Sequence, residues 1–485
     1  MNDETKGDYR PDPAFRALSP DGAPFYDAVE AARFSTEIIR YRNDRWAARV
    51  GLGGLDDNAW RARFARFEPL PDNLQKPIAL RYHGHQFRVY NPDIGDGRGF
   101  LYAQLRDADG RLLDLGTKGT GRTPYSRSGD GRLTLKGAVR EVLATEMLEA
   151  RGVYTSKTFS VVETGEALER GDEPSPTRSA ALVRLSHSHV RFGAFQRLGF
   201  EGDKTAIETL VDYCIRQFDP DLTAAAGGSG RVAAFFERVV ARTARLAAQW
   251  MAAGFVHGVL NTDNMNVTGE SFDYGPWRFL PRADFTFTAA YFDHGGLYAY
   301  GRQPDAAAWN LSRLGGVLAL IAEEAPLNAA LQRFDDFFRA GMAEAFFARL
   351  GVAPSSDGFA FVGDLLKWME AADAPFEPFF FDWFAGPASE TRAMEGPRAA
   401  LYAAPDFAPI RKRLTGFAPT KAGCLSADYF AGAPCDMLID EVEETWSAIA
   451  ERNDWDPLEG KLAAIAAARE AYALDASTYR AAPFD

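Results

Sequence analysis

The sequence predicts an α+β protein whose first part is rich in strands and whose second part is rich in helices. Residues 78–186 alternate short apolar runs with turn residues and contain one strongly periodic helix. After about residue 205, apolar residues recur at steps of three and four, which is typical of amphipathic helices. A chain of 485 residues is long enough for two or three structural units. The expected units are an N-terminal extension, a sheet-rich lobe, a helical lobe and a C-terminal helical region, at 1–75, 76–200, 201–320 and 321–485.

Strand signals dominate the sheet-rich lobe. The runs GFLYAQLRD and RLLDLGTK flank the turn residues 107–110, which predicts a hairpin. Residues 133–150 predict a helix that ends before Gly152, and the runs TFSVVE and AALVRLS predict two further strands around a polar loop. Residues 1–75 are expected to lie over this core as an extension.

The helical lobe is interrupted near its middle. A long amphipathic helix over 232–253 is expected to stop at Gly254, and the segment MNVTGESFDYG, residues 265–275, predicts a small hairpin. A protein-kinase-like, two-lobed phosphotransferase has a sheet-rich part first, a helical part second and a small hairpin near the junction of the two. We therefore expect that fold, with an N-terminal extension and a helical C-terminal region.

Composition and charge exclude several classes of protein. Hydrophobic residues make up 46% and charged residues 25%, as in folded globular proteins. The net charge of −13 repels nucleic-acid phosphates, and no apolar stretch reaches the roughly 18 residues of a membrane span. Cys214, Cys424 and Cys435 form no C-x-x-C motif, and the first residues form no apolar signal segment. We expect a cytoplasmic protein without nucleic-acid or membrane partners.

Two glycine-rich turns are candidates for phosphate or nucleotide contact. In IGDGRG, Gly95 and Gly97 allow backbone N–H groups to approach phosphate oxygens, and Arg98 adds positive charge. The same pattern also occurs in ordinary tight turns. In SGDGR, Asp130 and Gly131 either contact a nucleotide or only close the loop.

A lysine and a glutamate form the next candidate. Lys118 ends a predicted strand beside glycines, and Glu141 lies in the following predicted helix, beside its apolar stripe. Kinases pair a strand lysine with a helix glutamate to hold phosphates. Otherwise both side chains are solvated surface charges.

The segment VRLSHSHVRFG supplies two arginines in an acidic protein. Arg184 and Arg191 could grip phosphate oxygens with their guanidinium forks, or form internal salt bridges. His187 and His189 lie between them, but without a third ligand they do not predict a zinc site.

The most specific motif is HGVLNTDNMN followed by DYG. From His257 to Asn264 the spacing equals that of the kinase catalytic loop, and Asp273 follows as the second metal ligand does in kinases. Val259 occupies the position of the kinase base and cannot accept a proton. Asp263 is the carboxylate left in this loop. Alternatively, Asp263 caps a turn and Asp273 is a hairpin residue.

Together these segments resemble the selenoprotein O family of kinase-fold proteins that transfer AMP to protein hydroxyls. The resemblance covers residues 80–310 and includes YHGHQF, KGTGRTPYSRSGDGR, AVREVLATEML and HGVLNTDNMN. It implies a metal-dependent adenylyltransferase that uses ATP with Mg²⁺ or Mn²⁺, modifies Ser, Thr or Tyr hydroxyls and releases pyrophosphate, with UTP as a possible second donor. It also implies that ATP is held reversed relative to a kinase, so that the α-phosphate faces the acceptor.

The resemblance assigns roles by matching motif. Asp263 is implied as the base, and Asn264 and Asp273 as the metal ligands. The implied nucleotide-binding residues are Gly95, Gly97, Arg98, Lys118, Glu141, Asp130, Gly131, Arg184 and Arg191. Some members carry a selenocysteine or cysteine near the C-terminus, whereas the last thiol here is Cys435, so redox control by a terminal thiol is not expected.

Two alternatives remain open. One is an ordinary kinase in which Asp263 serves as base, and the other is a catalytically inactive nucleotide-binding scaffold. The local motifs encode neither the acceptor protein nor the oligomeric state.

Overall fold

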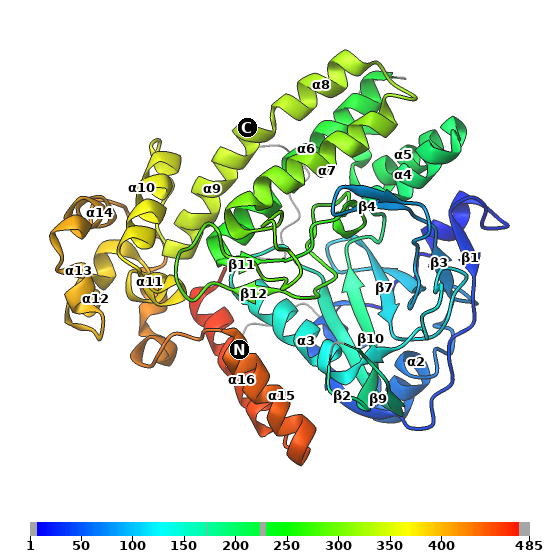
Figure 1. Ribbon diagram of the computed structural model, residues 1–485, viewed down its shortest axis with the longest axis horizontal. Helices are drawn as coiled ribbons and strands as arrows, with labels where there is room; N and C mark the ends of the chain where they lie inside the picture. Colours follow the sequence, from blue (N-terminus) through cyan, green and yellow to red (C-terminus); the bar gives the residue numbers. More distant parts are fainter. Residues whose placement is uncertain (1–6, 172, 224–228, 475–485) are drawn as a thin grey trace.

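The computed structural model describes residues 7–171, 173–223 and 229–474 and places a large sheet beside an extensive helical body (Figure 1). In the described residues the main sheet is antiparallel, with strand order β1-β3-β6-β7-β10-β9-β2 and β8 paired to β10. Two small sheets pair β4 with β5 and β11 with β12. The strands are β1 Tyr26–Ala28, β2 Ile38–Arg42, β3 Ile78–Leu80, β4 Gly84–Gln86, β5 Val89–Asn91, β6 Leu101–Arg106, β7 Leu112–Lys118, β8 Leu133–Thr134, β9 Lys157–Leu168, β10 Thr177–Ser186, β11 Phe255–Val256 and β12 Arg278–Phe279.

As predicted, the helix content is low in the first part of the chain and high in the second. In the described residues two short helices precede the strands β3 to β7 in sequence, one packs against β9 and β10, and all the others follow residue 190 (Figure 1). They are α1 Asp44–Arg49, α2 Asp57–Phe64, α3 Leu135–Ala150, α4 Phe192–Glu201, α5 Lys204–Phe218, α6 Ser229–Ala253, α7 Gln303–Leu318, α8 Glu324–Gln332, α9 Phe334–Leu350, α10 Gly358–Ala371, α11 Phe376–Asp382, α12 Glu390–Glu395, α13 Ala399–Tyr402, α14 Ala408–Leu414, α15 Ile439–Arg452 and α16 Asp456–Tyr472. The mixed α and β character predicted from the sequence is confirmed.

The predicted elements of the sheet-rich part are present. Strands β6 and β7 form the expected hairpin, and the buried Asp107 carboxylate stabilises its turn by accepting the backbone N–H groups of Asp109 and Arg111 at 3.0 and 2.9 Å. Helix α3 begins after Thr134, whose side chain accepts the N–H of Gly137, and ends before Gly152 at φ +79°.

The described residues 7–75 contribute directly to the sheet. Strand β1 pairs with β3 at one edge, and β2 pairs with β9 at the other. Helix α2 packs its Trp60 and Phe64 side chains against Phe159 of β9. The N-terminal segment is therefore an integral part of the sheet as well as a cover for it.

The hairpin predicted at 265–275 is wrong. The N–H of Gly269 donates to the carbonyl of Asn266 in a tight turn, but the two flanks do not pair with each other. Asn266 instead bridges to Arg191, and Ser271 bridges to Thr155. The flanking apolar runs are too short to form a ladder of their own, so partners from other elements fix the segment that leads to Asp273.

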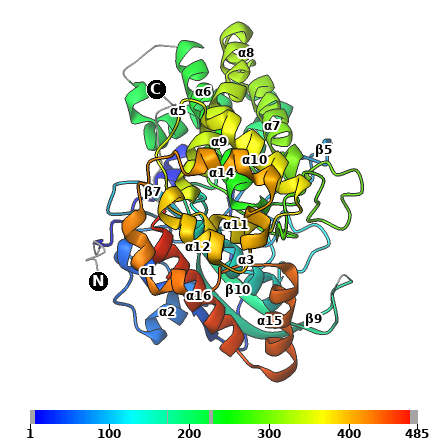
Figure 2. The ribbon, with the colours of Figure 1, turned by 90° about the vertical axis from the view of Figure 1, so that its left-hand side faces the viewer.

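Helix α3 is held between the sheet and the last two helices of the chain. Helices α15 and α16 pack along it, as the views in Figures 1 and 2 show. Ion pairs of 2.6 Å join Lys136 to Glu443 and Glu146 to Arg469. The C-terminal region thus supports the helix that carries Glu141. None of the helices in the described residues combines the length and apolar character that a membrane-spanning segment requires.

A buried charge cluster joins Arg151, the residue that follows α3, to α9 and α11. The carboxylate of Glu377 lies 3.2 Å from Nε of Arg151 and contacts Arg349, and all three side chains are almost fully buried. We predict that Glu377→Gln lowers the free energy of unfolding by about 3–5 kcal/mol, because it leaves Arg349 without its carboxylate partner. The apparent melting temperature measures this loss. Glu390→Gln, at a half-exposed pair with Arg411, should cost less than about 1 kcal/mol, and an equal loss in both variants would contradict the argument.

Candidate active site

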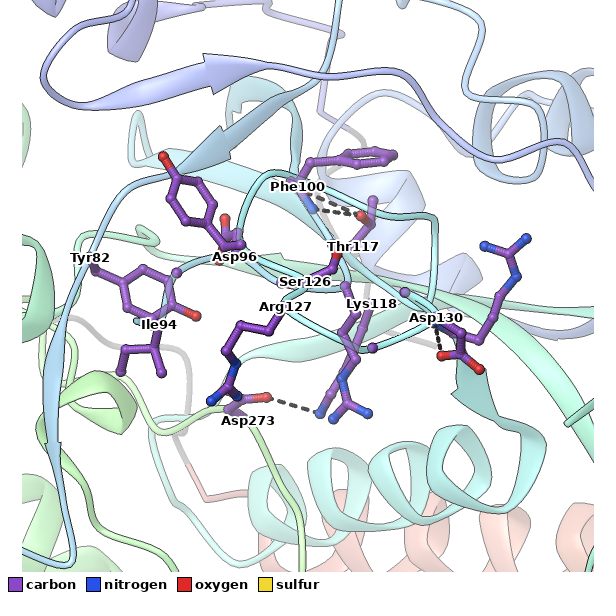
Figure 3. A pocket seen from close by; sticks show the side chains of 18 of the residues that line it. Tyr82, Ile94, Asp96, Phe100, Thr117, Lys118, Ser126, Arg127, Asp130 and Asp273 are labelled. Atoms are coloured by element: carbon purple, nitrogen blue, oxygen red, sulfur yellow. Dashed lines mark hydrogen bonds and ion pairs between the residues drawn. The ribbon is translucent and has the colours of Figure 1, made fainter. Parts of the chain in front are cut away.

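A cavity of about 640 Å³ lies between the main sheet and the loops around it, within the range of about 300–1,000 Å³ for ligand pockets (Figure 3). Tyr82 and Ile94 form one wall, Asp130 lies toward the opposite side, and Lys118 and Asp273 point toward each other (Figure 3). Of the described residues that line it, nine were singled out from the sequence, namely Gly95, Gly97, Arg98, Lys118, Asp130, Gly131, Arg184, Arg191 and Asp273.

The cavity is positively charged although the chain is acidic. Its described lining contains seven arginine or lysine side chains and four carboxylates, in a protein of net charge −13. Low-dielectric walls concentrate such a field and attract anions. The cationic residues are Arg98, Lys118, Arg127, Arg132, Arg170, Arg184 and Arg191.

The expected contact between Lys118 and Glu141 is present. Lys118 ends β7, Glu141 lies in α3, and Nζ and Oε2 are 2.7 Å apart with both side chains buried. Glu141 does not line the cavity. It therefore acts on the cavity through Lys118, and its other oxygen lies 3.5 Å from the guanidinium of Arg184.

The carboxylate of Asp273 gathers three cations. Its Oδ1 lies 2.9 Å from Lys118 and 3.5 Å from Arg184, and its Oδ2 lies 3.2 Å from Arg191. Burial by itself raises the pKa of Asp273, but these three cations hold the pKa well below its ordinary value. Asp273 is consequently an anion in the folded protein.

The backbone at Asp273 is constrained by the loop that begins at His257. Asp273 adopts φ +65°, which is uncommon for a residue other than glycine. The buried His257 ring donates from Nε2 to the carbonyl of Phe272 at 3.0 Å, because a carbonyl can only accept. This bond joins the start of the HGVLNTDN motif to the DYG motif.

Arg184 is oriented by a buried histidine. The Nε of Arg184 donates to Nε2 of His189 at 3.3 Å, so the ring carries its proton on Nδ1, which faces the Asp114 carboxylate at 3.3 Å. Burial lowers the pKa of His189, in agreement with a neutral ring. Gly116 lies opposite Arg184 in the β7–β10 pair, and a Cβ there would lie 2.1 Å from Nε2 of His189.

Arg191 connects the cavity to Asp263. Its Nη1 donates to the main-chain carbonyl of Asp263 at 2.7 Å as well as to Asp273, while the guanidinium lies 4.8 Å from the ring centres of Tyr82 and Phe272. Neither Asp263 nor Asn264 lines the cavity itself. The loop of Asp263 and the segment of Asp273 are nevertheless both bound by the guanidinium of Arg191.

The side chain of Asp263 is nearly buried, and one of its oxygens has no partner among the described residues. It is 9% exposed, and burial raises its pKa to about 6, although Arg191 lowers the pKa. Its buried Oδ1 has no hydrogen-bond partner among the described residues. The adjacent Asn264 donates from Nδ2 to the carbonyl of Val259 at 3.0 Å, which leaves its amide oxygen available as a ligand.

Both glycine-rich turns pack closely against the loop between Gly121 and Ser126. A Cβ at Gly95 would lie 2.5 Å from the Tyr125 ring, and one at Gly97 would lie 2.9 Å from the Tyr125 carbonyl. Gly131 has φ +72° and lies against Gly121. These glycines are required by close packing, and the turns they form also line the cavity.

Several lining residues were missed by the sequence reasoning. Tyr82 and Asp96 contact Arg191, with Asp96 Oδ1 3.8 Å from its guanidinium and Oδ2 accepting the Leu80 N–H at 3.0 Å. Arg170 binds the Asp130 carboxylate at 2.8 Å. Asp96 lies within the IGDGRG motif, which is the signal that could have identified it.

Comparison with known proteins decides the family. The family model described as protein adenylyltransferase SelO matches residues 12–397. The chain belongs to the SelO family of protein adenylyltransferases.

Curated relatives of this SelO chain carry the name protein nucleotidyltransferase YdiU. The relative from Gloeobacter violaceus is 44% identical over 92% of both chains. The relative from Synechocystis is 40% identical over 92% of this chain and 95% of its own, and that from Rhodococcus jostii is 38% identical over 70% and 66%.

The residues present fit the divalent cation that this kind of enzyme uses. A carboxylate and an amide oxygen, from Asp273 and Asn264, are hard oxygen ligands, and the buried Oδ1 of Asp263 lies in the residue before Asn264. The described residues contain no cluster of three His, Cys, Asp or Glu side chains suited to a metal. The cation would therefore need phosphate oxygens and water to complete its shell, as Mg²⁺ usually does.

The packing of His189 on Gly116 leads to a prediction for this SelO family member. In Gly116→Ala the added methyl group displaces the His189 ring, so Arg184 loses a hydrogen bond that orients it. A hydrogen bond to a charged group contributes about 1.5–3 kcal/mol, so the affinity for an ATP analogue should fall about ten- to hundred-fold. Calorimetric titration measures the affinity. Gly363→Ala, which meets open space in α10, is the matched control. Unchanged binding by Gly116→Ala would contradict the argument that His189 orients Arg184 for nucleotide binding.

Proposed function

We propose that this chain transfers AMP from ATP to Ser, Thr or Tyr hydroxyls of acceptor proteins and releases pyrophosphate, with Mg²⁺ or Mn²⁺ and with UTP as a second donor. The observation that carries the proposal is the loop in which Val259 replaces the kinase base while Asp263, Asn264 and Asp273 remain. Family membership supports the same activity, and the sheet-then-helix order supports a protein-kinase-like, two-lobed fold.

In this proposal the cavity binds the nucleotide through its phosphates. Lys118, Arg184 and Arg191 converge on Asp273 and are the cations nearest the proposed metal ligands. The turn that contains Gly95, Gly97 and Arg98 forms part of the cavity wall. Glu141 positions Lys118, and Asp130 and Gly131 contact the nucleotide from the loop held by Arg170.

Asp263 is the proposed base. The acceptor oxygen attacks the α-phosphorus, a P–O bond forms to the acceptor, the bond to the β-phosphate breaks, and the hydroxyl proton passes to the Asp263 carboxylate. A raised pKa suits a carboxylate to this role because a stronger base takes the proton more readily. Asn264 and Asp273 would hold the divalent cation, which would supply positive charge next to the leaving pyrophosphate. Arg184 and Arg191 neutralise the charge that develops on the same leaving group.

A cytoplasmic location and the absence of nucleic-acid partners stay predictions from the composition and net charge.

We predict that intact-mass measurement after incubation with ATP and an acceptor detects the addition of AMP. ATP labelled on the α-phosphate should label the acceptor, whereas ATP labelled on the γ-phosphate should not. Transfer of γ label alone would establish the kinase alternative. No transfer with either Mg²⁺ or Mn²⁺ would favour the inactive scaffold.

Substitution of the two aspartates should separate their roles. Asp263→Asn removes the proton acceptor, so we expect kcat to fall about 10²- to 10⁴-fold with little change in nucleotide affinity. Asp273→Asn removes the proposed metal ligand and should also weaken metal-dependent nucleotide binding. Steady-state rates and calorimetry measure the two effects, with the exposed Asp406→Asn as control. An Asp263→Asn enzyme of normal kcat would exclude Asp263 as the base.

A further inference from the structure

The hairpin formed by β4 and β5 is attached to the loop that carries Asp263. The N–H of His85 donates to Oγ1 of Thr262 at 2.7 Å, and the N–H of Phe87 donates to Oδ1 of Asn261 at 3.0 Å. Gln196 of α4 contacts both Nδ1 of His85 and Oγ1 of Thr262. The hairpin, α4 and the proposed base loop therefore form one hydrogen-bonded unit.

The turn of this hairpin has an unusual backbone. Gln86 pairs with Val89, so Phe87 and Arg88 form a two-residue turn, and both have positive φ, +49° and +64°. Asn and Gly are the residues that normally occupy such turns. Strain of this kind persists where the surroundings enforce it, and it concentrates at functional sites. The turn presents Arg88 to solvent.

Exposed apolar side chains gather around the same hairpin. In the described part of the chain seven large apolar residues are exposed. Five of them lie near the hairpin: one on β5, one on α4, one just after α7 and two in the segment after residue 290, where Phe292 contacts Phe87. The five are Val89, Phe200, Tyr291, Phe292 and Leu320.

A groove of about 440 Å³ runs between the hairpin, α4 and α7, and Phe200 and Leu320 both line it. The Phe200 ring is 64% exposed and stacks on Tyr90 with the ring centres 5.4 Å apart. In Figure 1, β4, α4 and α7 lie on the same side of the molecule. Apolar surface exposed in one place marks an interaction site more often than scattered residues do.

Two arginines give this surface a positive charge. Arg88 and Arg313 lie 5.4 and 5.2 Å from the ring of Trp309 in α7. Both are exposed, and neither forms an ion pair with a described residue. In a chain of net charge −13, two cations without counter-ions beside apolar side chains are complementary to an acidic and apolar partner.

We propose that this surface, formed by Arg88, Val89, Phe200, Arg313 and Leu320 and named here the hairpin surface, docks the acceptor protein. The docked segment carries an acidic side chain next to an apolar one, and docking brings its hydroxyl to the loop of Asp263. The inference rests on the proposed function, since it names the class of acceptor for that site. An acceptor protein is favoured over a membrane because the hairpin is bonded to the loop that must receive the hydroxyl.

The test uses synthetic peptides and the full-length protein. Fluorescein-labelled 15-residue peptides carry a central Thr flanked by Leu and Glu, or the same sequence with Lys in place of Glu, and a second pair has Ala in place of Thr. Fluorescence anisotropy with the Ala peptides measures docking without any reaction. We expect the Glu peptide to bind about ten-fold more tightly than the Lys peptide, and the double variant Arg88→Glu, Arg313→Glu to reverse this preference.

Two further variants complete the design. Lys367→Glu, Lys412→Glu makes the same change in net charge on α10 and α14, on the other side of the molecule in Figure 1, and should keep the preference for Glu peptides. Phe200→Ser should weaken binding of the Glu and Lys peptides alike. An unchanged ATP-analogue affinity in the double variant shows that the nucleotide cavity is intact.

The outcomes separate the two proposals. Binding of the Glu peptide that the double variant loses supports the hairpin surface even where no AMP is transferred, in which case the proposed function fails alone. AMP transfer to the Thr peptides without charge preference overturns the hairpin surface and leaves the proposed function standing. No measurable binding of any peptide also overturns the docking proposal. Binding to phosphatidylserine vesicles that the double variant loses would assign the surface to a membrane instead.

Discussion

The site depends on one partly buried carboxylate, that of Asp273, and the three buried cations that surround it. Lys118 comes from β7, Arg184 from β10 and Arg191 from the segment before α4, so a single anion joins three elements of the fold. Without it the three cations would repel one another in a poorly solvated space, and removal of one partner from such a buried cluster is strongly destabilising. A polyphosphate offers the cations further oxygens, and this would release Asp273 toward a metal ion.

Support for this carboxylate extends to the end of the described chain. Glu141 fixes Lys118, and Glu141 belongs to α3, whose outer face is tied to α15 and α16 by the pairs Lys136–Glu443 and Glu146–Arg469. The paired residues are 307 and 323 positions apart in sequence, yet these contacts hold the helix from which the lysine is positioned. The described part of the C-terminal region therefore has a structural role in the site, and none of its residues lines the cavity.

The Lys118–Glu141 contact could be predicted because a strand end and the next helix of the chain are neighbours in space. The two readings of Arg184 and Arg191, phosphate grip or internal salt bridge, turn out to be compatible, since both arginines bind Asp273 and both line the cavity. Tyr82 could not be predicted as a partner of Arg191, because 109 positions separate them and periodicity carries no information at that range. The prediction of a hairpin at 265–275 was wrong because the flanks of this segment pair with Thr155 and Arg191, which are distant in sequence.

The loop around Asp263 stands between two positively charged regions of an acidic protein. On one side, Arg191 binds the Asp263 carbonyl and faces the cavity that contains the other six cations. On the other side, Thr262 binds His85 of the hairpin, whose turn carries Arg88. In the proposed reaction the donor and the acceptor approach this loop from these two sides. Since both regions are fixed to the loop by direct hydrogen bonds, the distance between a bound phosphate and a docked hydroxyl is set by the fold rather than by the substrates, which is the condition for efficient transfer between two bound reactants.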